Sequence, residues 1–260
     1  MSTGLTLSVI VPVYKAEHFI QKNLRTFQSS VKKLVPRVVD RVELIAVIDG
    51  YVDRSQAEAK KVKGVKVVGY SRNQGKGHAL KVGYAQATGN IVTFLDADGD
   101  FNPDQIINFF PYLATADIVV GSKRHPFSKI EYPLIRKIFS NGFRCVSKIF
   151  LGIGLRDTQS GLKLIKKQVL DVIMPSLVIK RYAFDVELCF LAQVHGFRTV
   201  EAPVCIEFKG DSTIGVGAPY GLAWKMFMDV LAIRYRYSVK KYYQRKYHEA
   251  HFPFLAGKRE

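Results

Sequence analysis

The sequence predicts an α/β domain with a mostly parallel central sheet, and two observations carry this prediction. Apolar runs of strand length alternate along the chain with longer helical segments, which is the pattern of repeated strand-helix-strand units. Of the 260 residues, 48% are hydrophobic and 12% are aromatic. This composition excludes a disordered chain and is sufficient for a substantial buried core.

The elements alternate through the first half of the chain. Strands are expected where Val, Ile and Leu dominate, at 5–13, 42–48, 65–70, 91–95 and 117–121. Helices are expected at 17–34, 55–63, 77–87 and 104–113. Ligands of parallel sheets bind beyond the carboxyl ends of the strands, so we expect a ligand site in the segments that follow these strands.

Charge is the unusual part of the composition. The formal net charge is +17, which predicts an anionic partner: nucleic acid, a membrane surface or a phosphorylated substrate. The three cysteines are far apart and indicate neither a disulfide framework nor a zinc site. No signal peptide is visible and no apolar run reaches eighteen residues, so we expect a protein that does not span a membrane.

Three aspartates follow the most apolar strand run. Asp96, Asp98 and Asp100 come directly after 91–95, and the Gly at 99 favours a turn there. Hard divalent cations prefer oxygen ligands and are often held by one or two carboxylates together with substrate phosphates. The motif therefore predicts a metal-diphosphate site, and the alternative is a solvated acidic turn.

Three other strand-end loops carry candidate ligand contacts. We expect Tyr14, which follows the strand end near Pro12, either to stack on a nucleobase or to belong to an ordinary turn. Asp49 accepts hydrogen bonds from a base or ribose, or else caps its loop. The segment 71–77 combines two glycines with two cations and opens a helix, whose amino-terminal end favours an anion. Its candidate residues are Arg72, Gly75 and Lys76.

Together these loops resemble the family-2 glycosyltransferases of the nucleotide-diphospho-sugar (GT-A) fold. The motifs are VIVPVY at 9–14, DGYVD at 49–53, RNQGKGHAL at 72–80 and DADGD at 96–100. RDTQSGLKL at 156–164 and YAFDVELCFLAQ at 182–193 are similar to the branch that transfers hexoses to polyprenyl phosphates, above all the dolichyl-phosphate glucosyltransferases and mannose synthases. The resemblance covers roughly residues 5 to 240.

This resemblance implies inverting transfer of a hexose from a nucleotide-diphospho-sugar, UDP-glucose first and GDP-mannose next, to a polyprenyl phosphate, with Mg²⁺ or Mn²⁺ as cofactor. The implied catalytic residues are Asp98, Asp157 and Asp185, and the implied metal ligands are Asp96, Asp98 and Asp100. The donor contacts are Pro12, Tyr14, Asp49, Arg72, Gly75, Lys76, Asp96 and Asp98. The acceptor phosphate is assigned to Lys123, Arg124 and Ser160.

The sequence departs from the family pattern at two nucleotide-side positions. Ala16 stands where the family usually has a glutamate, and Ile48 where it usually has the first aspartate of a pair. Both departures concern donor binding rather than the reaction. Glu187, within the last motif, is expected either to contact the sugar or to lie on a solvated helix face.

Two basic helices explain part of the net charge. In 134–151 the residues Arg136, Lys137, Arg144 and Lys148 share one face opposite an apolar one, as in helices that lie in a membrane interface. A second helix, 222–240, ends in a cluster of Arg, Lys and Tyr. We therefore expect a catalytic domain at 1–215, a membrane-interface extension at 216–260, and a peripheral protein on the cytosolic face of a membrane. The oligomeric state is not predicted.

Three alternatives remain open. One is a glycosyltransferase that acts on a polysaccharide or protein without a membrane. Another is a basic nucleic-acid-binding protein, although no RNP, KH or zinc-finger signature is present and no nucleic-acid partner is expected. The third is a non-catalytic family member, for which Ala16 and Ile48 are the only indications.

Overall fold

The computed structural model describes residues 4–130, 134–206 and 219–251. The strands of the main sheet are β1 (Thr6–Val13), β2 (Arg41–Asp49), β3 (Val65–Tyr70), β4 (Ile91–Phe94), β5 (Ile118–Ser122), β7 (Lys163–Lys166) and β8 (Thr199–Pro203). A small ribbon pairs β6 (Lys129–Ile130) with β9 (Cys205–Ile206). The helices are α1 (Ile20–Lys32), α2 (Ser55–Lys60), α3 (Lys76–Tyr84), the 3-10 helix η1 (Pro103–Ala114), α4 (Leu134–Leu151), α5 (Lys167–Ile173), α6 (Phe184–Val194), α7 (Pro219–Ser238) and α8 (Tyr242–His251).

Within the described residues, the main sheet has seven strands in the order β3-β2-β1-β4-β7-β5-β8. Every neighbouring pair is parallel except the two that β7 makes with β4 and β5. The predicted mostly parallel sheet is therefore confirmed. The antiparallel strand has a consequence for the site, because β7 begins at the edge where the parallel strands end.

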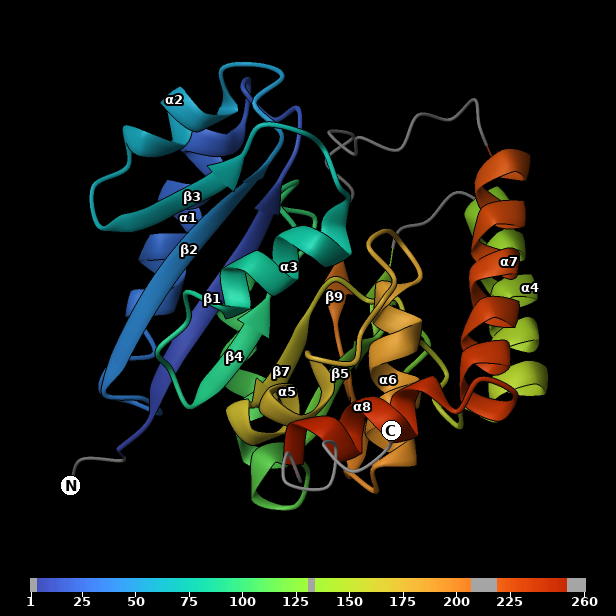
Figure 1. Ribbon diagram of the computed structural model, residues 1–260. Helices are drawn as coiled ribbons and strands as arrows, with labels where there is room; N and C mark the ends of the chain where they lie inside the picture. The colour runs from blue at the N-terminus through green and yellow to red at the C-terminus, as the bar shows by residue number, and fades with distance from the viewer. Residues whose placement is uncertain (1–3, 131–133, 207–218, 252–260) are drawn as a thin grey trace.

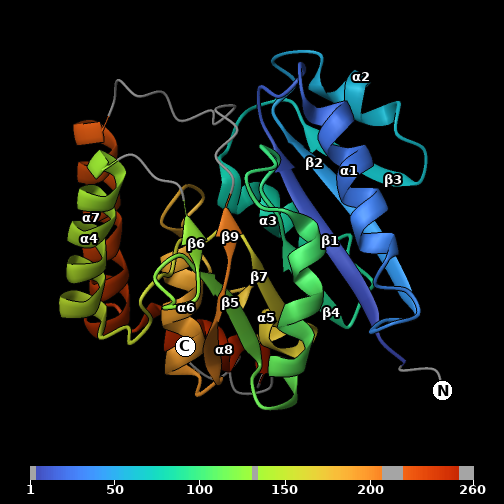
Figure 2. The same ribbon diagram turned by 180° about the vertical axis from the view of Figure 1, so that it is seen from behind.

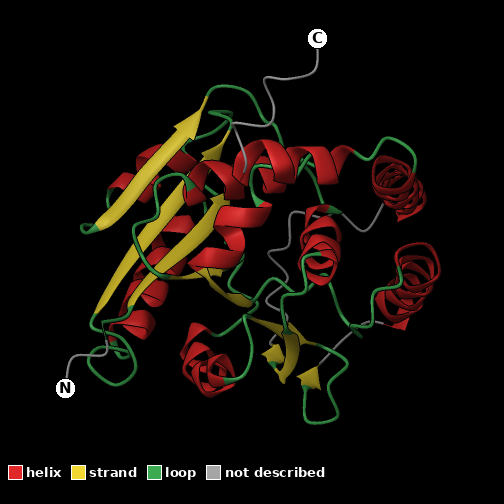
Figure 3. Ribbon diagram, turned by 60° about the horizontal axis from the view of Figure 1, so that its bottom comes forward, coloured by secondary structure: helices red, strands yellow, loops and turns green. Residues whose placement is uncertain are grey.

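Helices cover both faces of the sheet, as Figure 1 and the view from behind in Figure 2 show. The helices α1, α2 and η1 lie on one face, and α3, α5, α6 and α8 lie on the other. Figure 3 shows the strands between these two helical layers. The arrangement buries both faces of the sheet, as parallel strands require.

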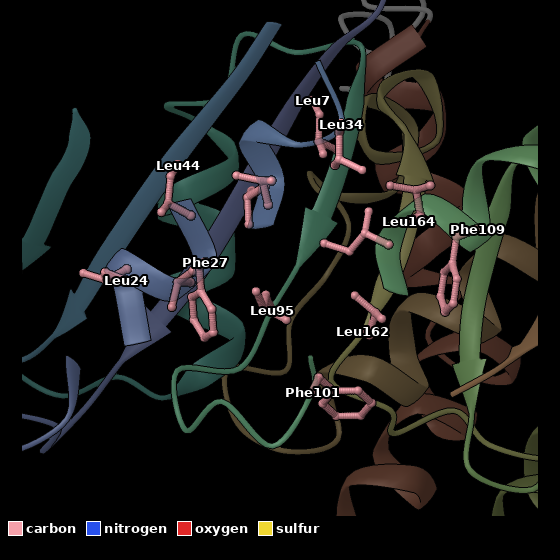
Figure 4. Packing of buried hydrophobic residues seen from close by; sticks show 14 of the residues in the cluster. Leu7, Leu24, Phe27, Leu34, Leu44, Leu95, Phe101, Phe109, Leu162 and Leu164 are labelled. Atoms are coloured by element: carbon pink, nitrogen blue, oxygen red, sulfur yellow. The ribbon is translucent and has the colours of Figure 1, made fainter. Parts of the chain in front are cut away.

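The sequence pattern explains the packing of the first two elements. Ile20, Leu24, Phe27 and Val31 recur at helical spacing on α1 and all point into the core. Figure 4 shows the inner part of this core, where Leu24 and Phe27 lie with Leu95 and Leu162 between α1 and the middle of the sheet. The odd-numbered residues of β1 belong to the same cluster, while Ile10 belongs to the cluster on the opposite face.

Several predicted elements differ in detail from the observed ones. The expected helix at 104–113 is a 3-10 helix that contains Pro111, a residue that removes a donor from regular α-helical bonding. The proposed boundary between 215 and 216 falls within 207–218, outside the described residues. None of the described helices combines the length and the apolar character that a bilayer-spanning segment needs.

Helices α4 and α7 lie side by side at the margin of the molecule, away from the strands (Figure 1). Phe150 of α4 meets Phe227 of α7 edge to face, with ring centroids 6.0 Å apart. Val230 and Ile233 anchor the second half of α7 in the core. The second half of α7 is therefore attached to the core, while Trp224 and Met228 nearer its start are exposed.

Glu187 on α6 is buried and holds two neighbouring segments. One of its oxygens accepts the hydroxyl of Tyr243 on α8 at 2.6 Å, and the other accepts the backbone N–H groups of Val178 and Ile179 at 2.9 and 2.8 Å. Burial raises the pKa of this carboxyl above its usual value. Both expectations for Glu187, a sugar contact or a solvated helix face, are wrong, because tertiary packing encloses the side chain.

A second buried charge joins β7 to α6. The ammonium group of Lys163, 1% exposed, lies 2.7 Å from Asp185 Oδ1 and donates to the Ser160 carbonyl at 2.6 Å. Lys163 pairs with Phe94 at the end of β4, since β7 runs antiparallel to β4. The pair therefore fixes α6 against the end of the strand that precedes the aspartate motif.

Loss of this buried pair should destabilise the protein strongly. We expect Lys163→Met to lower the free energy of unfolding by roughly 3–5 kcal/mol, because Asp185 then loses its closest counter-charge in the interior. Lys166→Met is the matched control, because Lys166 lies on the same strand as Lys163 but its ion pair with Asp117 is partly exposed. Surface ion pairs contribute about 0–1 kcal/mol to stability. Urea denaturation measures both.

A double-mutant cycle separates the charge from the packing. Lys163→Met combined with Asp185→Asn should cost less than the sum of the two single variants, since the uncompensated carboxylate is gone. If Lys163→Met is no more destabilising than Lys166→Met, the buried pair does not hold β7 to α6.

Candidate active site

The carboxyl-terminal edge of the sheet brings together residues from distant segments. Asp96 and Asp98 follow β4, and Lys76 is the first residue of α3. The ammonium group of Lys76 lies 2.7 Å from Asp96 Oδ1 and 3.7 Å from Asp185 Oδ2. Together with the pair already described, this gives a series of alternating charges, Lys163, Asp185, Lys76 and Asp96, which we call the charge chain.

The charge chain runs from the core to the surface. Its side chains are 1%, 6%, 22% and 28% exposed in that order. Burial alone would raise the pKa of Asp185, but the ammonium groups of Lys163 and Lys76 outweigh burial and hold it below its ordinary value. Burial would lower the pKa of Lys76, but Asp96 and Asp185 raise it above the ordinary value. Asp185 and Lys76 are therefore both charged at neutral pH.

The aspartate motif carries more negative charge than its neighbours compensate. Burial, together with the charges of Asp96 and Asp100, raises the pKa of Asp98 to about 7. An oxygen of Asp98 also accepts the backbone N–H of Asp100 at 3.2 Å, so the turn keeps these residues close. The three carboxylates repel one another, and a bound cation would offset this repulsion. The cluster therefore fits a cation site better than it fits a solvated acidic turn.

The donor set suits a hard divalent ion that shares its ligands with a substrate. Within the part of the chain that the structure describes, no group of three or more His, Cys, Asp or Glu side chains is arranged to hold a metal by itself. Mg²⁺ is commonly bound by one or two carboxylates, with water and substrate phosphates completing its shell. Asp96 and Asp98 fit this description, and the role of Asp100 as a third ligand stays a prediction.

The loop before β7 packs closely against Asp96. A side-chain carbon on Gly161 would collide with Asp96 Oδ2 and would also approach the ring of Phe101. Only glycine therefore lets the loop lie against the carboxylate. Because the loop belongs to the RDTQSGLKL motif, this motif fixes the position of the Asp96 carboxylate.

Asp49, at the end of β2, is surrounded by donors of its own chain. Its carboxylate accepts the hydroxyl of Tyr70 at 2.8 Å, the side-chain amide of Asn73 at 2.8 Å, and the backbone N–H groups of Gln74 and Gly75 at 2.7 and 2.9 Å. A carboxylate offers about four lone-pair sites, and these bonds use them. Asp49 thus holds the 71–77 loop in shape, and a direct contact of Asp49 with the nucleotide stays a prediction.

The same loop depends on a close glycine contact. Gly75 has a φ of +101°, a left-handed conformation that glycine favours. An added side-chain carbon there would lie 2.5 Å from the Lys180 carbonyl oxygen. The loop therefore rests directly on the segment that Glu187 fixes.

The other residues predicted to contact the donor lie around this edge without joining the charge chain. Pro12 and Tyr14 are half-buried at the end of β1, and Arg72 is exposed. The two departures from the family pattern are explained by packing, because Ala16 and Ile48 are each only 1% exposed and belong to the apolar core. The positions where a carboxylate is usual are filled by buried apolar groups here.

Asp157 and Lys123 form a second polar cluster near the same edge. One oxygen of Asp157 accepts the backbone N–H of Lys123 at 3.1 Å and lies 3.7 Å from its ammonium group. The other oxygen accepts the Gln159 N–H at 3.0 Å. The hydroxyl of Ser160 is buried without a hydrogen-bond partner among the described residues. Arg124 directly follows Lys123, and its N–H donates to Ser122 Oγ at 3.3 Å.

Lys163 is the member of the site that sequence reasoning missed. The residue reads as part of an apolar strand, Leu162-Lys163-Leu164-Ile165, and its partner Asp185 is 22 positions away. A lysine inside an apolar strand indicates a buried ion pair, because lysines are almost never fully buried unless an acid pairs with them. No local pattern indicates which acid would be its partner.

The family model described as "Glycosyl transferase family 2" matches residues 8–174. The chain is 29% identical over 253 residues to a dolichyl-phosphate beta-glucosyltransferase of Dictyostelium discoideum, which covers 90% of this chain and 75% of that protein. It is 28% identical over 200 residues to an undecaprenyl-phosphate mannosyltransferase of Micrococcus luteus, covering 75% of this chain and 81% of that protein.

A solved structure of glucosyl-3-phosphoglycerate synthase from Mycobacterium tuberculosis, in complex with Mn²⁺, UDP-glucose and phosphoglyceric acid, has a similar fold. Its TM-score is 0.64 at 19% identity, over 89% of this chain and 79% of that chain. The GT-A fold is thereby confirmed, and the family match favours the glycosyltransferase interpretation over a nucleic-acid-binding protein. Since the family model covers most of the chain, from β1 to the end of α5, the protein belongs to glycosyl transferase family 2.

Proposed function

We propose that this glycosyltransferase transfers a hexose from a nucleotide-diphospho-sugar to a polyprenyl phosphate. The observation that carries the proposal is the placement of the Asp96 and Asp98 carboxylates at the same edge as the cations Lys123 and Arg124. Carboxylates suit a metal-bound diphosphate, and Arg and Lys side chains suit a phosphate. The names of the relatives, dolichyl-phosphate beta-glucosyltransferase and undecaprenyl-phosphate mannosyltransferase, support this pairing of substrates.

On the donor side we favour UDP-glucose, with GDP-mannose next. The glucosyltransferase relatives and the Mycobacterium complex with UDP-glucose and Mn²⁺ support this choice. Asp96 and Asp98 would hold Mg²⁺ or Mn²⁺, which when bound neutralises charge on the departing diphosphate. Lys76 lies beside Asp96 at the amino-terminal end of α3, so its ammonium group and the helix end add positive charge for the same diphosphate.

On the acceptor side no strong general base is needed. The second pKa of a phosphate monoester is about 6, so its oxygen is largely deprotonated near neutral pH. Lys123, Arg124 and Ser160 orient this phosphate for attack on the face of the sugar opposite the diphosphate, which inverts the anomeric centre. Asp157 and Asp185 act by holding Lys123 and Lys76 in position, since ion pairs already occupy both carboxylates.

We propose that α4 and α7 rest on the cytosolic face of a membrane without crossing it. Ile149 on α4 is 70% exposed, and Trp224 and Met228, one turn apart on α7, are 63% and 46% exposed. Exposed cations accompany them at Lys148 and Lys225. A tryptophan beside cations is typical of helices at a membrane interface. The side chains of Arg136 and Lys137, which the sequence analysis placed on this surface, lie outside the described part.

The proposal is tested by incubating the protein with Mn²⁺, a polyprenyl phosphate and either radiolabelled UDP-glucose or GDP-mannose. Label should pass into the lipid fraction and be released by mild acid as a sugar. Transfer only to a polysaccharide or protein acceptor would favour the alternative glycosyltransferase instead.

Metal dependence follows from the aspartate motif. Asp98→Ala should abolish transfer while leaving the unfolding transition in place, and EDTA should do the same until metal is restored. Asp104→Ala is the control, because this aspartate follows in the same segment but pairs with Lys33 on the surface. Full activity in excess chelator would exclude the metal.

Asp49 should contribute first of all to the stability of the 71–77 loop, which it holds by hydrogen bonds. Asp49→Ala removes the acceptor of four donors, two of them backbone N–H groups, so we expect the free energy of unfolding to fall by at least about 2 kcal/mol. The donor KM should rise as the loop loosens, measured in the same transfer assay. A raised donor KM with unchanged stability would instead indicate that Asp49 contacts only the nucleotide.

Membrane binding should combine a salt-sensitive and a salt-resistant part. High salt should weaken sedimentation with anionic liposomes without eliminating it, because apolar insertion is not screened. Replacing Trp224 and Met228 with Ser should lower the salt-resistant part roughly 10-fold or more, as expected for two apolar side chains. Val52→Ser is the control, since Val52 is 52% exposed on the distant loop between β2 and α2. Equal binding of all variants would exclude α7 as the contact.

A further inference from the structure

A small pocket lies between α4 and the loop that leads to β7, and three arginines line it. Arg124 comes from the segment after β5, Arg144 from α4, and Arg156 from the loop after α4. These segments are far apart in the sequence, and the fold gathers their positive charges despite mutual repulsion. Of these three arginines, only Arg124 belongs to the phosphate contacts predicted from the sequence.

The pocket has a net positive charge. Asp157 is the one carboxylate that lines it in the described structure, and this carboxylate is already paired with Lys123 at 3.7 Å. Neither Arg144 nor Arg156 forms a salt bridge through its side chain with any residue that the structure describes. Two guanidinium groups therefore remain available for an anion.

A buried hydroxyl lines the same pocket. Ser147 on α4 is 3% exposed, and its Oγ has no hydrogen-bond partner among the described residues. An enclosed hydroxyl without a partner costs free energy, which a polar ligand in the pocket would recover. This observation is independent of the arginines and points to the same kind of ligand.

The pocket is also partly apolar. Phe143 on α4 and Leu155 on the following loop line it beside the arginines, and both are half-buried. An anion that carries a hydrocarbon group would satisfy both sides. A free phosphate ion would satisfy only the polar one.

The pocket connects to the reaction centre through Lys123. Lys123 pairs with Asp157 at the pocket and also lowers the pKa of Asp185 in the charge chain through its positive charge. An anion held by the arginines would therefore lie beside Asp157, the partner of the predicted phosphate contact Lys123.

We propose that Arg144, Arg156 and Ser147 complete the binding site for the phosphate of the lipid acceptor, and that the hydrocarbon adjoining this phosphate packs on Phe143 and Leu155. This inference rests on the proposed function and adds residues that the family motifs did not assign. Because α4 supplies two of these three polar groups, the helix proposed to rest on the membrane also binds the headgroup. A guanidinium pair gives a phosphate bidentate recognition that an alcohol cannot use.

The test uses farnesyl phosphate as a short acceptor, so that membrane binding does not enter the measurement. Arg144→Gln and Arg156→Gln should each raise the acceptor KM roughly 10-fold or more, the usual effect of losing a hydrogen bond to a charged group, with kcat and donor KM nearly unchanged. Arg41→Gln is the matched control, an exposed arginine at the opposite end of the sheet. Ser147→Ala should raise the acceptor KM several-fold without loss of stability.

The ligand class is tested by competition. Unlabelled farnesyl phosphate should inhibit transfer to the radiolabelled acceptor much better than farnesol or glycerol 3-phosphate in the wild type, and this advantage should shrink in the arginine variants. Equal inhibition by glycerol 3-phosphate would mean that the pocket binds only the phosphate group. It would overturn the proposal that the hydrocarbon packs on Phe143 and Leu155.

Two failures are distinguishable. If the wild type transfers no sugar to any prenyl phosphate, the proposed function is wrong. If it does, but Arg144→Gln, Arg156→Gln and Ser147→Ala keep the wild-type acceptor KM, only the assignment of this pocket is wrong.

Discussion

The buried ion pair between Lys163 and Asp185 is the interaction on which the rest of the site depends. A charge in the interior must be paired, so Lys163 fixes the position of Asp185, and Asp185 with Asp96 fixes Lys76. Asp185 and Lys76 thus each lie between two opposite charges, and Lys163 at the buried end also donates to the Ser160 carbonyl. Asp96, the outermost, is additionally held by the loop at Gly161. The Asp185 and Asp96 carboxylates are therefore positioned by ion pairs and packing within the chain itself.

Helix α6 relates this edge to the carboxyl-terminal helices. Asp185 faces the charge chain, while Glu187, two residues later, binds Tyr243 of α8 and the backbone at 178–179. The carbonyl of Lys180, in the same segment, accepts the N–H of His78 at 3.2 Å at the start of α3. The start of α3, the charge chain and α8 are thus all held by α6 and the segment that precedes it.

The features that could be predicted from the sequence are those that depend on local patterns of residues. The strands up to β5 and the aspartate motif follow from apolar periodicity and from glycine and proline turns, which depend only on near neighbours. The antiparallel strand β7, the partner of Lys163 and the enclosure of Glu187 depend on pairings between distant segments, which no local pattern contains. For the same reason Arg144 and Arg156 were not predicted as phosphate contacts, whereas Arg124 was predicted together with its sequence neighbour Lys123.

The insertion of β7 beside β4 has a consequence for the synthesis of the chain. All four residues of β4 are apolar or buried, and Thr93 meets Lys163, its hydrogen-bond partner, only across 70 positions of sequence. During translation, at about 5–20 residues per second, β4 is therefore an unpaired sheet edge for roughly 4–14 s. Such an edge invites pairing with another nascent chain. Until β7 emerges, the strand that precedes the aspartate motif is therefore a segment that a chaperone would need to protect.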